Sequence, residues 1–159
     1  MPLASETFTQ HVKNYCTWVE GDLHTLKSAR EHLILLMADI PFLEEYRDGE
    51  VKGEYSRREH GEWEKDCKRF TDLPFQYYQT VFDAHELSSE DPVTGYLQDD
   101  LADIYGDLLE GLQAHLVGET IDALRIWVDS YFCHWGYHLI SALKAIDDFY
   151  RQGYGVNTK

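Results

Sequence analysis

The sequence has no apolar stretch long enough to cross a bilayer. Its longest purely apolar run covers residues 33–38, whereas a membrane-spanning helix needs about 20 apolar residues. The first residues, MPLASE, contain neither a basic segment nor an apolar one, so no secretory signal peptide is recognisable. We therefore expect a protein that does not insert into membranes and that resides in the cytoplasm.

Cysteine is scarce as well. Cys16, Cys67 and Cys133 lie far apart and form no Cys-x-x-Cys pair. Such an odd and scattered set argues against a disulfide framework and against a zinc knuckle. Three reduced thiols agree with the cytoplasmic location expected above.

Motifs that identify several large enzyme classes are also missing. No glycine-rich phosphate loop, no Gly-x-Ser-x-Gly and no His-Glu-x-x-His occurs. Each of these motifs builds a particular kind of site. In their absence, the sequence identifies no catalytic residue and no cofactor-binding residue. It makes an enzyme less expected without excluding one.

Basic residues are absent from a long part of the chain. The sequence has 29 acidic and 14 basic residues, a net charge of -15, and residues 70–124 contain no Lys or Arg at all. An acidic surface repels a phosphate backbone, so we expect no direct binding of nucleic acid. The same surface could dock a basic protein partner, or it could simply keep the protein soluble.

Helical spacing dominates the pattern of apolar residues, and no segment keeps the alternation of a strand. A length of 159 residues suits one domain with one hydrophobic core. The sequence thus predicts a single all-α domain over residues 1–159, folded as an irregular bundle of about five helices, monomeric or weakly dimeric. The predicted helices cover residues 5–20, 22–40, 72–87, 98–117 and 119–151.

The helical spacing of apolar residues is interrupted at two places. Residues 47–69 contain glycines among alternating charges and few aliphatic residues, which predicts a long charged surface connection. Gly136 lies inside the last predicted helix, where it could kink the helix or admit a close neighbour.

The fourth predicted helix carries a row of aspartates. Asp100, Asp103 and Asp107 recur at spacings of three and four, on the side away from the apolar stripe. Carboxylates without a basic neighbour repel one another and attract a divalent cation, so these three are candidate metal ligands. A row of this kind is also typical of an ordinary solvated helix face, and the sequence leaves both interpretations open.

His134 and His138 lie four residues apart on the last predicted helix, so their rings can meet on one face. Metal-binding histidine pairs use this spacing, and both are candidate ligands. Buried aromatic neighbours place the pair at the edge of the core, where a histidine needs a hydrogen-bond partner. A carboxylate such as Asp100 or Asp103 on the neighbouring helix would supply that partner without any metal.

The chain resembles a bacterial family of small helical proteins that is known only as a domain of unknown function. The resemblance covers roughly residues 70–148, with a weaker echo in the first helix. It depends on DDLADIY at residues 99–105, on Gly111-Leu112, on Trp127 and on HWGYH at residues 134–138. The resemblance implies an all-helical bundle in a bacterial cytoplasm, and it implies no chemistry.

Two hypotheses for the function follow. The first is a non-catalytic interaction or regulatory protein whose acidic helices bind a basic partner. The alternative is a metal-dependent hydrolase, or a metal-binding bundle, that uses the aspartates of the fourth helix. An outward-facing acidic helix would favour the first, and carboxylates that converge with the histidines would favour the second.

Because of its charge, we expect the protein not to bind DNA or RNA measurably at physiological salt. A fluorescence-anisotropy titration of a labelled random duplex measures this. Micromolar binding that weakens as salt rises would show the expectation to be wrong.

Overall fold

The structure is a computed structural model of the chain, and it describes residues 3–56, 58–87 and 91–154. These residues are mostly helical, which confirms the all-α class, and they include one small antiparallel hairpin. None of the described helices is long and apolar enough to cross a membrane. The helices are α1 (Ala4–Glu20), α2 (Leu26–Asp39), α3 (His60–Lys68), α4 (Leu97–Leu116), α5 (Thr120–Ser130) and α6 (Gly136–Arg151), and the strands are β1 (Tyr77–Thr80) and β2 (Val93–Tyr96).

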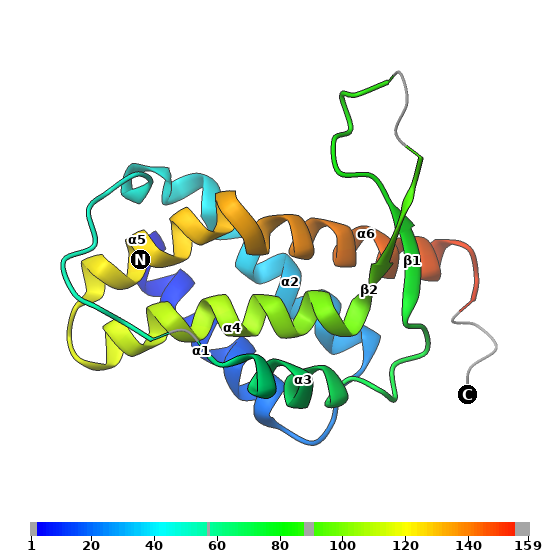
Figure 1. Cartoon of the computed structure of the whole chain (residues 1–159), viewed down its shortest axis with the longest axis horizontal. Helices are drawn as coiled ribbons and strands as arrows, with labels where there is room; N and C mark the ends of the chain where they lie inside the picture. Colours follow the sequence, from blue (N-terminus) through cyan, green and yellow to red (C-terminus); the bar gives the residue numbers. More distant parts are fainter. Residues whose placement is uncertain (1–2, 57, 88–90, 155–159) are drawn as a thin grey trace.

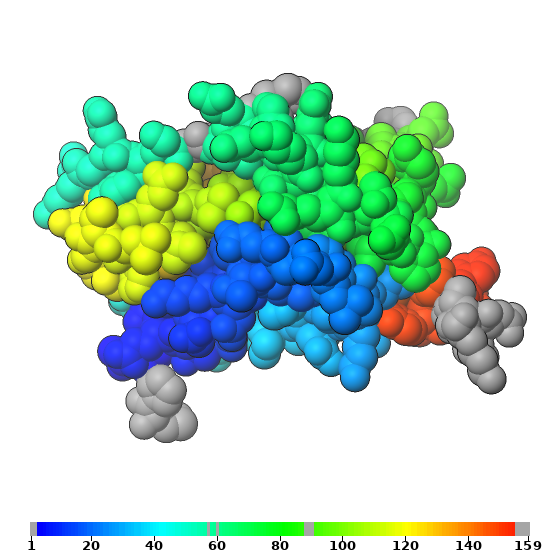
Figure 2. Space-filling view, turned by 90° about the horizontal axis from the view of Figure 1, so that it is seen from below, coloured from blue at the N-terminus to red at the C-terminus, as the bar shows by residue number. Residues whose placement is uncertain are grey.

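The first two helices form an antiparallel pair. Both were predicted from the sequence, but α2 begins at Leu26, four residues later than expected. The apolar stripe of α1 is buried, and Gly21 ends the helix, as expected. The α2 helix begins after Thr25, whose side chain accepts a hydrogen bond from the backbone N–H of Ser28 at 3.0 Å. Seen from below, α1 lies across the face of the molecule with α2 on one side and α3 on the other (Figure 2).

Helix α4 is the central element of the bundle. It contacts α1, α3, α5 and α6, and it runs through the middle of the fold in Figure 1. Its apolar stripe is fully buried, and the Tyr15 hydroxyl of α1 donates a hydrogen bond to the backbone carbonyl of Leu101 at 2.8 Å. A helix with neighbours on several sides has little surface left for solvent. The buried stripe consists of Leu97, Leu101, Ile104 and Leu108.

The last predicted helix is continuous but irregular. Helix α5 passes through a π-helical turn, Tyr131–Trp135, directly into α6. A Cβ atom on Gly136 would lie 2.5 Å from the carbonyl oxygen of Tyr131, so this turn can close only on a glycine. The expected disturbance at Gly136 is therefore a π-helical turn that ends there.

The predicted helix over residues 72–87 is wrong. Tyr77–Thr80 forms β1 instead, which pairs with β2 so that Tyr78 lies opposite Gly95. The apolar residues of this segment are aromatic or β-branched, and such residues favour strands. Their spacing fitted a helix, but the decisive partner strand lies after a turn-rich segment and could not be recognised from the local pattern.

The predicted connection over residues 47–69 is also more ordered than expected. Its last part forms α3, whose side chains at Asp66 and Cys67 are buried against the bundle. With α5 and α6 counted as one continuous helix, the described part of the chain holds five α-helices. The number agrees with the prediction, although α3 takes the place of the helix expected at 72–87.

Trp135 is expected to be essential for stability because its ring is fully buried and its indole N–H donates to the Trp127 carbonyl at 2.9 Å. Replacing Trp135 with Ala should lower the free energy of unfolding by about 3–5 kcal/mol. Phe132→Ala in the same turn is the control, since Phe132 is 38% exposed. It should cost under about 1.5 kcal/mol in urea unfolding. An equal loss of unfolding free energy in the two variants would contradict the burial of Trp135.

Candidate metal centre

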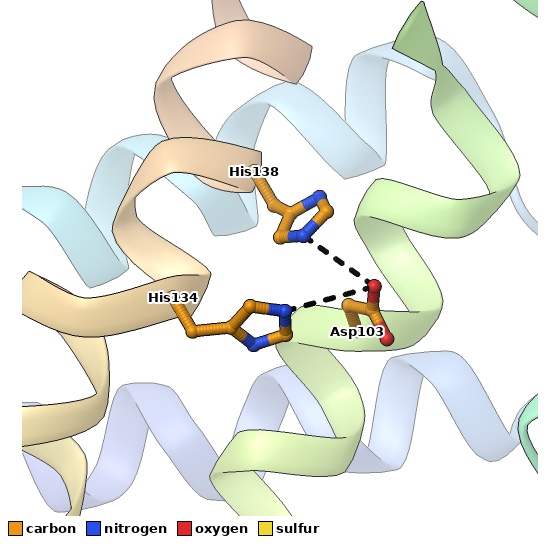
Figure 3. Close-up of side chains that lie close together, drawn as sticks. All are labelled: Asp103, His134 and His138. Carbon is orange, nitrogen blue, oxygen red and sulfur yellow. Dashed lines mark ion pairs between the residues drawn. The ribbon is translucent and has the colours of Figure 1, made fainter. Parts of the chain in front are cut away.

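Two histidines of the last helix face the aspartates of α4. His134 lies in the π-helical turn and His138 lies one turn later in α6. Their rings are 4.8 Å apart at an angle of 76°. Both side chains point across the gap between α6 and α4 toward Asp103 (Figure 3). The i, i+4 spacing in the sequence thus brings the two rings together, as expected.

Each histidine is held at Nδ1 by a different carboxylate of α4. His138 Nδ1 lies 2.8 Å from Asp100 Oδ1, and His134 Nδ1 lies 2.7 Å from Asp107 Oδ2. An ionised carboxylate can only accept a hydrogen bond, so the Nδ1 atom of each ring carries the proton. In the neutral rings, the lone pairs are then on the Nε2 atoms.

Both Nε2 atoms converge on one oxygen of Asp103. The distance to Asp103 Oδ2 is 3.4 Å from His138 Nε2 and 4.0 Å from His134 Nε2 (Figure 3). A nitrogen lone pair that faces a carboxylate oxygen is repelled by it unless a proton or a cation lies between them. Ligand bonds of 2.0–2.2 Å at a tetrahedral metal ion separate neighbouring ligand atoms by about 3.3 Å. The spacing therefore suits a metal ion after small shifts.

Arg58 fixes the orientation of Asp103. Its Nη2 donates to Asp103 Oδ1 at 3.1 Å, and its Nη1 donates to the buried Asp66 at 2.8 Å. The guanidinium lies against Gly106, where a Cβ atom would come within 2.5 Å of Arg58 Nε. Because Arg58 occupies Oδ1, the other oxygen of Asp103 is turned toward the histidines.

Asp100 is the most buried of the acidic groups in this site, with 3% of its surface exposed. The Tyr78 hydroxyl of β1 donates to one of its oxygens, and His138 donates to the other. Burial raises the pKa of Asp100, and the two hydrogen bonds offset this only in part. The hairpin therefore contributes a direct contact to the carboxylate that holds His138.

His138 has a raised pKa. Burial acts to lower its pKa, but the hydrogen bond to Asp100 and the negative charges of Asp100 and Asp103 outweigh burial. Protons consequently compete for this ring up to a pH above the ordinary histidine value of about 6.5. A metal ion would have to displace that proton.

A surface cleft of about 430 Å³ opens beside Asp103. Asp99 and Trp63 line it together with Arg58 and Glu59, and the Trp63 side chain donates a hydrogen bond to Asp99. Burial, followed by the nearby charge of Asp103, raises the pKa of Asp99. The site is therefore open to solvent on this side.

All five candidate ligands of the sequence analysis come together, but in two roles. His134, His138 and Asp103 converge through atoms that lie within 4.8 Å of one another, whereas Asp100 and Asp107 hold the far sides of the rings. Asp99, Asp100 and His138 form a second group of potential ligand atoms at similar spacing.

Three further residues of the site were missed by the sequence analysis. Arg58 and Trp63 come from the charged connection, where no ligand-like spacing marks them. Tyr78 was placed on a helix that does not exist. Residues 47–69 hold seven basic and seven acidic residues, half of the 14 basic residues of the chain. This concentration of cations was the only hint that the connection could neutralise the aspartates.

Comparison with known proteins supports the fold and supplies no activity. The model of a protein family described as "Domain of unknown function (DUF5063)" matches residues 4–152. No curated protein matches the chain. The crystal structure of protein BF1032 from Bacteroides fragilis is similar, with a TM-score of 0.68 and 20% identity over 90% of this chain and 89% of that one. At this identity the likeness concerns the fold alone.

In the metal-free protein, His138 should matter more for stability than His134. His138→Ala leaves one oxygen of the buried Asp100 without its partner, which should cost about 3 kcal/mol. His134 has 48% of its side chain exposed, so His134→Ala should cost under about 1 kcal/mol. Urea unfolding in the presence of a chelator measures both. Equal losses would mean that Asp100 does not depend on His138.

Proposed function

We propose that this chain, which belongs to the DUF5063 family of unknown function, binds a divalent metal ion through His134, His138 and Asp103 and uses it for hydrolysis. One observation carries the proposal: both Nε2 atoms face Asp103 Oδ2, at 3.4 Å and 4.0 Å, while carboxylates hold both Nδ1 atoms. Without a metal ion or a proton on Nε2, a nitrogen lone pair of each ring would face a carboxylate oxygen.

The set of ligands indicates the kind of ion. Two imidazoles and one carboxylate suit borderline ions such as Zn²⁺, Mn²⁺ and Fe²⁺ better than Ca²⁺, which prefers six to eight oxygens. Three protein ligands leave at least one coordination position open, as in catalytic zinc sites, whereas structural zinc sites are closed by four.

The surroundings of the three ligands also fit a metal site. Metal-binding histidines commonly donate their second ring N–H to a carboxylate, which fixes the ring and makes it a better ligand. Asp100 and Asp107 are in this position here. Arg58 orients Asp103 in the same way.

The open side of the site supports the proposal of hydrolysis. A metal-bound water loses its proton far more easily than bulk water, and Asp99, which lines the cleft next to Asp103, would accept that proton. A bound metal ion would thus supply a nucleophilic water for an electrophilic substrate in the cleft, and Asp99 would return the proton to the leaving group. The raised pKa of Asp99 suits a group that both accepts and returns a proton.

The competing hypothesis is a non-catalytic protein that binds a basic partner in the cytoplasm. It predicted an outward-facing acidic helix. Asp100, Asp103 and Asp107 instead have side chains that are 5%, 20% and 13% exposed. These three carboxylates have partners within the molecule, which leaves less charge for a partner protein and favours the metal site.

Metal titration of the chelator-treated protein tests the proposal. We expect saturable binding of Zn²⁺ by calorimetry, and a stabilisation of about 2.7 kcal/mol when free Zn²⁺ is 100 times the dissociation constant. Co²⁺ should give visible absorption bands that report its coordination number. His134→Ala, His138→Ala and Asp103→Asn should each weaken binding at least 100-fold, an order-of-magnitude expectation for the loss of a ligand.

Two exposed positions outside the site supply matched controls. His85→Ala and Asp72→Asn make the same chemical changes and should leave the affinity for Zn²⁺ unchanged. Affinity should fall as the pH is lowered, because protons compete for the imidazoles. A dissociation constant that is the same in all five variants would exclude this site, and the absence of saturable binding would exclude the metal altogether.

A further inference from the structure

A second cleft lies between β1 and α6, and Tyr78 forms part of its lining. The hairpin crosses α6 at this end of the molecule (Figure 1). The cleft has a volume of about 460 Å³. Small-molecule sites in proteins commonly measure about 300–1,000 Å³, so the space suits a compact ligand.

Aromatic rings form one wall of this cleft. Phe75 and Phe149 stack with ring centroids 5.3 Å apart and an interplanar angle of 29°, and Tyr154 lies 5.8 Å from Phe149. Such rings offer flat faces to a ligand, and planar rings pack on them in offset or edge-on arrangements. The wall therefore favours a flat molecule over a branched aliphatic one.

Polar groups without net charge line the rest of the cleft. The hydroxyl groups of Thr80 and Ser141 lie 3.4 Å apart. Lys144 and Asp148 neutralise each other in an ion pair. Hydroxyl groups can donate to or accept from a ligand, whereas a protein with a net charge of -15 attracts no anion to a neutral cleft. An uncharged molecule with hydrogen-bonding atoms on its edge fits this lining.

Tyr78 connects the cleft with the histidines. Its side chain lines the cleft, and its hydroxyl donates to Asp100, which in turn holds His138 at 2.8 Å. A ligand that shifts the Tyr78 ring therefore moves the carboxylate behind His138. If binding at one site changes the affinity of the other site, the reverse effect has the same factor.

We propose that the cleft between β1 and α6 binds an uncharged planar heteroaromatic molecule, and that Tyr78 couples this binding to the metal site. The proposal of a ligand site depends only on the lining and the volume of the cleft. Only the coupling rests on the proposed function.

Adenosine is the probe for the ligand site, because it is planar, uncharged and has hydrogen-bonding atoms on its edge. We expect saturable, submillimolar binding to the metal-free protein by calorimetry or ligand-observed NMR. Ala145 lines the cleft, and Ala145→Phe should fill it and weaken binding at least tenfold. Ala38→Phe makes the same enlargement on an exposed position of α2 and should leave the affinity unchanged.

Adenosine monophosphate tests whether the ligand must be uncharged. It adds a phosphate to the same base and sugar, so it should bind at least threefold more weakly than adenosine. Tighter binding of the monophosphate would overturn the uncharged class. The absence of saturable adenosine binding, or equal affinity in Ala145→Phe, would overturn the ligand site.

The coupling is measured as the ratio of the adenosine dissociation constants with and without saturating Zn²⁺. We expect this ratio to differ from one by at least threefold in the natural protein and to return to one in Tyr78→Phe. Tyr96→Phe is the matched control, because the Tyr96 hydroxyl donates to Gln98 and not to Asp100. A ratio of one in the natural protein would refute the coupling. If Zn²⁺ does not bind, the proposed function and the coupling fail together, while the metal-free titration still decides the ligand site.

Discussion

The central position of α4 is the constraint on which most of this structure depends. A helix that packs against α1, α3, α5 and α6 turns several sides toward other helices. Burial of its apolar stripe against these helices is favourable because of the hydrophobic effect. Burial of its acidic side is unfavourable, because an ionised carboxylate in a poorly solvated place is costly unless it is paired. The neighbours of α4 therefore have to supply cations or hydrogen-bond donors at particular positions.

Three elements far apart in the sequence meet that need. The last helix supplies His134 and His138, the connection before α3 supplies Arg58, and the hairpin supplies the Tyr78 hydroxyl. The guanidinium of Arg58 always carries its charge, and this single positive charge lies between Asp103 and Asp66 and donates to both. The histidines differ, since a ring without a proton on Nε2 turns a lone pair toward Asp103 Oδ2. The negative charge of the α4 carboxylates is fully compensated only when a proton or a metal ion lies between the Nε2 atoms and Asp103 Oδ2.

How much of this could be predicted from the sequence differs between the helices and the hairpin. Helices α1, α2, α4 and the last helix follow from a 3.6-residue period, because each buries one apolar stripe. The same reasoning failed at residues 72–87, where Phe75, Tyr78, Val81 and Phe82 fit a helix by spacing and a strand by residue type. Pairing with β2 decides between the two, and pairing is a contact that no local pattern contains.

The site shows the same division. The spacing of Asp100, Asp103, Asp107, His134 and His138 made them candidate ligands, because residues three or four apart share a helix face. A solvated acidic face remained equally compatible with that spacing. The different roles of the three aspartates were not predictable, since they depend on how α4 and α6 are turned toward each other. The position of Arg58 was not predictable either, because it lies in an irregular segment. Its approach to α4 also requires a residue without a Cβ atom at position 106, which Gly106 provides.

The π-helical turn connects the stability of the core with the geometry of the site. Trp135 and His134 are neighbours in this turn, yet Trp135 is fully buried and His134 is half-exposed beside Asp107. A π-helical turn is rarer than an α-helical one, is frequent at functional sites, and here requires a glycine at its end. Because the π-helical turn contains one more residue than an α-helical turn, it changes the phase of α6 relative to α5 by about 100°. The turn therefore lets a single helix seal the core with Trp135 and present His134 to the acidic side of α4.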